Sequence, residues 1–163
     1  MRKRYELKSV WKNEAGYNLV EIVVLLFVIG ILATIAAASF SGSMARHRLV
    51  TSARTMTADL REQRDLAMSK EDHTVVYIYI DENYYQMQKN NGTWENVYLP
   101  NTVRFAAYYD QSNTKKCTKM LSFFEQGNSN GGTSRLMNLN GDSKYIRVSP
   151  VTGRVYLSEN PPG

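Results

Sequence analysis

Cysteine and histidine are scarce in this sequence, and their scarcity excludes two kinds of chemistry. The 163 residues include one cysteine, Cys117, and two histidines, His47 and His73. A single cysteine cannot form a disulfide within the chain, so the fold must be held by core packing. These three residues also do not provide a ligand set with the spacing that a zinc site requires. We therefore expect no metal and no other cofactor.

The sequence patterns of common enzymes are missing as well. There is no nucleophile elbow, no glycine-rich phosphate loop and no histidine with carboxylates at a spacing that supports catalysis. Segments 81–83 and 138–142 carry oxygen donors, but neither keeps the calcium-loop pattern with its terminal glutamate. We expect a protein that is not an enzyme, and only a site assembled in three dimensions would contradict this.

Proline is absent from residues 18–70, and charge is absent between Glu21 and Arg46. Residues 22–38 are apolar or small apart from one threonine, and this block is long enough to cross about 30 Å of hydrocarbon. After the block, apolar residues recur with helical spacing at Leu49, Ala53, Met56, Leu60 and Ala67. The pattern predicts one helix of about 50 residues, with a transmembrane half and an amphipathic half.

The net charge of +5 is distributed unevenly along the chain. Residues 1–16 contain five Lys or Arg and two Glu, a charge of +3, which leaves +2 for residues 17–163. Basic residues that precede an apolar span stay on the cytoplasmic side of a membrane. We therefore expect a single-pass protein of the cell (inner) membrane, with a cytoplasmic N-terminus and the C-terminal part outside, in the periplasm or at the cell surface.

From residue 74 onward, β-branched and aromatic residues alternate with turn-forming residues. Segments 81–83 and 90–92 are predicted to form hairpin turns, and 127–132 a flexible loop. The predicted strands are 74–80, 84–89, 93–99, 103–108, 120–124, 145–148 and 154–157. We predict an α+β fold in which the long helix packs on an antiparallel β-sheet. The eleven tyrosines are expected to pack in this sheet, and a stacking platform for sugars or bases is the alternative.

The junction between the basic leader and the apolar block is the most specific signal. Gly16 is followed by an aromatic residue, Tyr17, and Glu21 stands five residues after the glycine, at the edge of the apolar block. A carboxylate costs roughly 2.5 to 3.5 kcal/mol inside a spanning helix, so Glu21 calls for a charged partner. This arrangement resembles the processing signal of type IV prepilins and type II secretion pseudopilins.

The resemblance implies how the chain is processed and assembled. It implies cleavage after Gly16 by an integral-membrane prepilin peptidase and N-methylation of the new amino terminus at Tyr17. The Tyr17 amine would then be neutralised by the Glu21 carboxylate of a neighbouring subunit. The implied organisation is a leader at 1–16, a transmembrane and filament-core segment at 17–45, and an exported pilin-like domain at 46–163. The implied partners are the prepilin peptidase, other pilin or pseudopilin subunits, the inner-membrane assembly platform and, before assembly, the lipid bilayer.

Several weaker signals make the sequence similar to GspH/FimT-type minor pseudopilins. They are Ala53-Arg54, the Arg-Asp-Leu-Ala run at 64–67, and the segment 149–155. This similarity implies a minor structural subunit of a type IV pilus, a type II protein secretion pseudopilus or a competence pseudopilus.

A DNA-binding minor pilin that acts in DNA uptake is the alternative. Some relatives bind DNA through a Gly-Arg-x-Arg motif, but here Gly153 and Arg154 are followed by valine and Tyr156, so one phosphate contact is missing. The DNA contacts would be Arg154, Lys115 and Lys116. Further basic residues that would extend this face are Lys119, Arg135, Lys144 and Arg147. A third hypothesis is a filament tip that binds a glycan or a protein.

Overall fold

The structure is a computed structural model that describes residues 19–109 and 118–161, without the side chains of 36–41 and 118. In this part of the chain the elements are α1 (Leu19–Lys70), β1 (Thr74–Tyr79), β2 (Tyr84–Gln88), β3 (Trp94–Tyr98), β4 (Val103–Tyr109), β5 (Thr118–Phe123), β6 (Gly132–Asn138), β7 (Ser143–Val148) and β8 (Val155–Ser158). The chain divides into a first unit, residues 1–40, and a second unit, residues 41–163, and α1 contributes to both.

The predicted long helix is confirmed. α1 runs from Leu19 to Lys70 over 52 residues, within the proline-free part of the sequence. It ends where Glu71 adopts a left-handed conformation with φ of 51°, and the Asp72 amide donates to the carbonyl of Ala67 at 3.2 Å. This bond caps the last turn of the helix and reverses the chain into β1.

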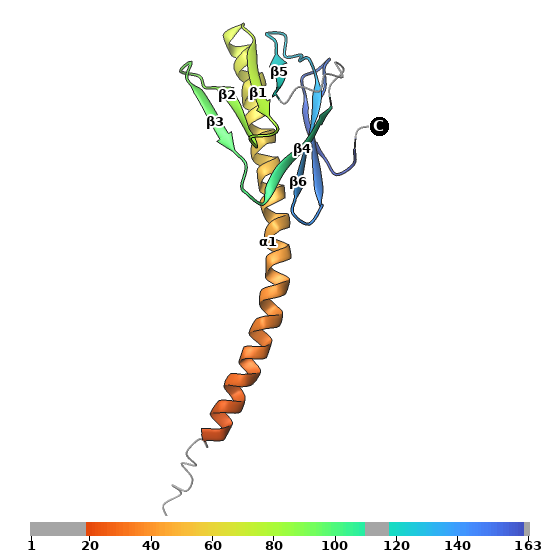
Figure 1. Ribbon diagram of the computed structural model, residues 1–163. Coiled ribbons are helices and arrows are strands. Elements are labelled where there is room, and N and C mark those ends of the chain that lie inside the picture. The colour runs from red at the N-terminus through yellow and green to blue at the C-terminus, as the bar shows by residue number, and fades with distance from the viewer. Residues whose placement is uncertain (1–18, 110–117, 162–163) are drawn as a thin grey trace, which may run out of the picture. The chain divides into compact units, whose positions relative to one another are not determined.

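The eight strands form two antiparallel sheets. The first sheet has the order β3-β2-β1-β5, and the second has the order β4-β6-β7-β8. In the second unit the two sheets lie beside the C-terminal half of α1 (Figure 1). The α+β architecture of a helix packed on antiparallel strands is therefore confirmed, although the strands make two sheets where the sequence predicted one.

The core of the second unit joins the helix to both sheets. The predicted helical stripe is confirmed, because Leu49, Ala53, Met56, Leu60 and Ala67 are all buried. They belong to one apolar cluster that includes Ile78 and Phe123 of the first sheet and Leu136 and Ile146 of the second. Burial of each large side chain in such a cluster stabilises the fold by about 1.5 to 3 kcal/mol.

Strand β6 (Gly132–Asn138) was missed by the sequence prediction. Polar and apolar residues do not alternate along it, and two adjacent polar residues, Thr133 and Ser134, are both buried. The strand exists because it pairs with β4 on one side and β7 on the other, so both of its edges are hydrogen-bonded. Pairing with two neighbours overrides a weak local propensity.

The predicted loop at 127–132 is a loop up to residue 131, Gly132 begins β6, and hydrogen bonds tie the loop to both sheets. Asn130 accepts from the Ser122 amide at 3.0 Å and donates to the Met120 carbonyl at 2.9 Å, which joins it to β5. The Ser129 hydroxyl donates to the carbonyl of Ser149 at 3.0 Å, beyond the end of β7. The asparagine and serine side chains that looked like loop formers therefore connect the two sheets.

Candidate functional site

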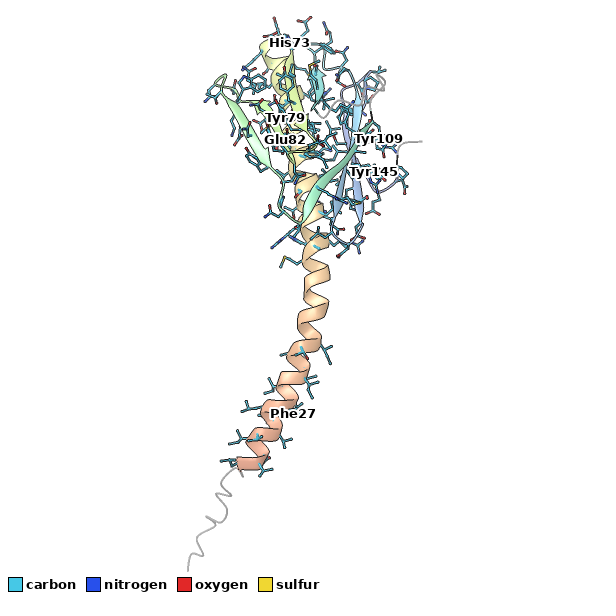
Figure 2. All side chains as sticks on the ribbon, in the orientation of Figure 1. Phe27, His73, Tyr79, Glu82, Tyr109 and Tyr145 are labelled. Atoms are coloured by element: carbon cyan, nitrogen blue, oxygen red, sulfur yellow. The ribbon has the colours of Figure 1, made fainter. Side chains whose placement is uncertain are left out.

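In the first unit, the described part of α1 presents an apolar surface with a single carboxylate. Every described side chain from Leu19 to Ile35 is exposed, and Glu21 is the one acidic residue among them. Phe27, 69% exposed, projects from this surface (Figure 2). An exposed run of this kind needs a partner that covers it, because unpaired apolar patches are rare on soluble monomers.

Among the residues that the structure describes, no helix contains an apolar stretch long enough to cross a membrane.

A groove in the second unit gathers three arginines from two parts of the sequence. Arg61, Arg64 and Asp65 line it from α1, while Arg154, Val155 and Tyr156 line it from the start of β8. Its volume is about 310 Å³. The three guanidinium groups face one carboxylate, so the groove has a net positive charge and suits an anionic ligand.

Two of these arginines also hold the groove together. The Arg61 Nη2 donates to the carbonyl of Val155 at 3.1 Å, and the Arg64 Nε donates to the carbonyl of Gly127 at 3.1 Å. Asp65 is 74% exposed and lies 3.8 Å from the Arg64 Nη1. Arg154 is exposed, and its side chain has no partner among the residues that the structure describes. It is therefore the arginine of the groove that is free to bind.

The backbone at Gly153 allows this close packing. Gly153 has φ of 58°, and a Cβ at this position would overlap the carbonyl oxygen of Gly127 and come within 3.2 Å of the Arg64 Nε. Its amide donates to the Ser149 carbonyl at 2.8 Å, which closes the turn before β8. A side chain at 153 would therefore displace the acceptor that Arg64 uses. The two segments similar to minor pseudopilins, 64–67 and 149–155, thus meet in three dimensions.

The structure describes only some of the predicted site residues. Gly16, Tyr17, Lys115 and Lys116 lie outside the described residues, as does Cys117. Arg154 has Arg61 and Arg64 beside it in the groove. Sequence analysis did not assign Arg61 to a site, although its spacing of three from Arg64 places both on one side of a helix.

The additional basic residues do not form one free basic face. Lys119 is buried in β5, and Lys144 pairs with Glu159. The Arg135 Nε donates to the Ser143 hydroxyl at 3.1 Å, while Arg147 donates to the carbonyls of Asn160 and Pro161. Lys144 holds the pKa of the Glu159 carboxyl below its ordinary value through a hydrogen bond and its charge.

One titratable pair lies between α1 and the first sheet. The Tyr85 hydroxyl of β2 donates a hydrogen bond to the Asp59 Oδ2 of α1. Burial raises the pKa of Asp59, and the hydrogen bond from Tyr85 opposes this shift. Burial and the bond to Asp59 both raise the pKa of Tyr85. This pair fixes the position of β2 on the helix. Within the described ranges, no cluster of three or more His, Cys, Asp or Glu side chains could hold a metal ion.

The fold is similar to two solved structures. The minor pseudopilin EpsH from the type 2 secretion system of Vibrio cholerae matches with a TM-score of 0.53 and 11% identity, over 69% of this chain and 97% of that one. The type IV minor pilin FimU of Pseudomonas aeruginosa matches with a TM-score of 0.52 and 17% identity, over 69% and 90%. No family model and no curated protein matches the sequence. At these identities the similarity establishes the fold, which is that of pilins and pseudopilins.

Proposed function

We propose that this chain is a minor structural subunit of a type IV pilus, a type II secretion pseudopilus or a competence pseudopilus. The pilin-like fold supports this assignment. The observation that carries it is the apolar surface of α1 between Leu19 and Ile35, which contains one carboxylate, Glu21. That surface is suited to lipid before assembly and to the helices of neighbouring subunits afterwards.

Energetics favour a covered state for this part of α1. Its described side chains include twelve of Leu, Ile, Val and Phe between 20 and 35 with exposed fractions of 46% or more. Full burial of each is worth about 1.5 to 3 kcal/mol, so covering them supplies a large driving force for membrane insertion or filament assembly. The proposed orientation has a cytoplasmic leader and a globular part outside, because the basic residues of 1–16 favour the cytoplasmic side of the membrane.

The processing step is proposed at Gly16, with N-methylation at Tyr17, by a prepilin peptidase. Co-expression of the full chain with this peptidase, followed by intact mass and N-terminal analysis of the membrane extract, tests it. The expected product starts at Tyr17 and carries one methyl group. An unchanged Met1, or a cut beyond Ala38, would show an ordinary anchor or secretory signal.

Glu21 is proposed to neutralise the Tyr17 amine of an adjacent subunit in the assembled filament. A buried unpaired carboxylate is costly, so the pair would set the axial register between subunits. Glu21→Gln is expected to be cleaved normally but to enter filaments poorly. The matched control is Glu62→Gln, which changes an exposed glutamate on the same helix outside the apolar stretch. Equal incorporation of both variants would remove the assembly role of Glu21.

The alternative function, DNA binding, is favoured by one observation, the arginine groove around Arg154. Binding through phosphates would weaken as salt increases, because each neutralised phosphate releases counterions. The test is binding of duplex DNA by the purified full chain near 50 mM and 200 mM salt, with Arg154→Gln as the variant and Arg104→Gln of β4 as the control. Affinity that falls with salt and with Arg154→Gln supports this function, and no binding near 50 mM salt rejects it.

A further inference from the structure

The outward side of the first sheet carries an ordered set of aromatic rings. Tyr79 and Tyr84 are stacked with their centroids 4.4 Å apart, and Tyr84 and Tyr98 lie 5.0 Å apart. Tyr77 and Trp94 follow at 5.7 Å. In the strand register, Tyr79 faces Tyr84 and Tyr84 faces Tyr98, so these three rings form one row across β1, β2 and β3. Stacking between cross-strand neighbours holds the rings in place.

Amide side chains lie among the rings. Gln86 faces Tyr77 on one side and Asn96 on the other, and Gln88 faces Trp94. Gln86 and Asn96 have no side-chain hydrogen bond within the described part of the chain. Each amide group offers both donors and an acceptor. We call these eight residues the aromatic face: Tyr77, Tyr79, Tyr84, Gln86, Gln88, Trp94, Asn96 and Tyr98.

The strand residues on the outward side of the first sheet are all uncharged, and the charged strand residues occupy inward positions. The four strands of the first sheet contain two charged residues, Glu95 and Lys119. Both occupy inward positions, since Glu95 pairs with Met87 and Lys119 with Ile78, which are buried against the helix. Lys119 is 8% exposed. An ordinary solvated face would carry the charges outward, so the neutral outer surface requires another explanation.

The rings remain accessible while they are fixed. Trp94 is 47% exposed, Tyr98 is 66% exposed, and neighbouring Met120 is 52% exposed. Tyrosine and tryptophan supply rigid contact area at a low cost in conformational entropy, and they dominate binding energy where they are used. In Figure 2, Tyr79 and the rim residue Glu82 lie at the end of the β1–β2 hairpin, apart from Tyr109 and Tyr145 of the second sheet.

We propose that the aromatic face binds a neutral β-linked oligosaccharide. The flat pyranose ring of such a sugar has an apolar C–H surface that packs on an aromatic ring and a rim of hydroxyl groups that pairs with amides. A nucleic acid would require lysine or arginine between the rings, and the face has neither. The amides of Gln86 and Asn96 among the rings, unpartnered within the described residues, suit the hydroxyl rim of a sugar, because each amide offers two donors and an acceptor. The proposal needs only the fold of the second unit, so it stands if the assembly role fails.

The experiment is titration calorimetry of the purified full-length chain in detergent micelles with cellohexaose and with chitohexaose. Saturable binding of at least one of them is expected. Trp94→Ala and Tyr98→Ala are each expected to lower the association constant about ten-fold or more, since they truncate the most exposed rings. Tyr109→Ala, which removes a 42% exposed tyrosine from β4, is the control and should bind as the unmodified chain does.

Thermal unfolding of each variant separates loss of binding from loss of folding. Absence of saturable binding to both sugars overturns the proposal, and so does an equal loss of affinity in Tyr109→Ala. Sedimentation velocity tests a second copy of the chain as the occupant. Self-association that Trp94→Ala abolishes, with no sugar binding, would identify the aromatic face as a subunit contact and would also overturn the proposal.

Discussion

Replacing Gly153 by alanine tests whether the contact between the turn before β8 and segment 124–131 stabilises the second unit. Gly153 has φ of 58°, and a left-handed conformation costs an alanine about 1 kcal/mol. The new Cβ would also overlap the Gly127 carbonyl, which accepts the hydrogen bond from the Arg64 Nε. Loss of a hydrogen bond to a charged group costs about 1.5 to 3 kcal/mol. The expected total is about 3 kcal/mol.

The matched control is Gly141→Ala. Gly141 has φ of 91°, so it carries the same kind of backbone strain, but no atom lies within 4 Å of its added Cβ. Urea unfolding of both variants, followed by circular dichroism, should show a loss of about 1 kcal/mol for the control and about 3 kcal/mol for Gly153→Ala. Equal losses would refute the overlap. In a double-mutant cycle, Arg64→Ala should cost less in the Gly153→Ala background, because the hydrogen bond is already lost.

Three further predictions concern the core, the hairpin turn and pH. Leu60→Ala should cost about 2 to 5 kcal/mol in urea unfolding, since Leu60 is 1% exposed in the core, whereas Leu139→Ala at 72% exposure should change stability by less than about 0.5 kcal/mol. Asn83 has φ of 60°, and its side chain donates to the Val103 carbonyl at 2.8 Å and accepts from the Phe105 amide at 3.0 Å. Asn83→Gly keeps the backbone conformation, so the expected loss of about 2 kcal/mol in unfolding free energy reports these two hydrogen bonds. An unchanged stability would contradict them. Because burial raises the pKa of Asp59 in the folded state, its contribution to stability is present below pH 3.8 and is lost as pH rises through the folded pKa. The difference in unfolding free energy between Asp59→Asn and the unmodified chain should therefore grow in favour of the variant over that range, and a difference independent of pH would contradict the shift.

The helix and its buried stripe could be predicted because their signals are local. Apolar residues at spacings of three and four place one side of α1 toward the core whatever it packs against. The β1–β2 and β2–β3 hairpins were also predictable, since turn residues at 81–83 and 90–92 separate strands that pair with their sequence neighbours. What the sequence indicated at Gly16, Tyr17 and Glu21 is a linear signal, and it stays a prediction.

The second sheet could be predicted less well because its pairings are long-range. β6 is stabilised by β4 and β7 together, and its own residues, with Thr133 and Ser134 adjacent and buried, carry no clear alternation. The same limit applies to the serine and asparagine side chains of 129–130, which resemble those of a mobile loop. Their hydrogen bonds connect two sheets, and these partners are known only after the chain has folded.

The sequence by itself determined the long helix, the side of it that is buried, and the hairpins that pair β1, β2 and β3. Tertiary structure alone decided that Arg61, Arg64 and Arg154 line one groove, and that the side of the first sheet with the five rings is the outward one. The physical reason is the range of the interactions. Helical and hairpin contacts join residues a few positions apart, while the groove depends on how β8 meets α1, and the aromatic face points outward because the other side of the first sheet packs on α1.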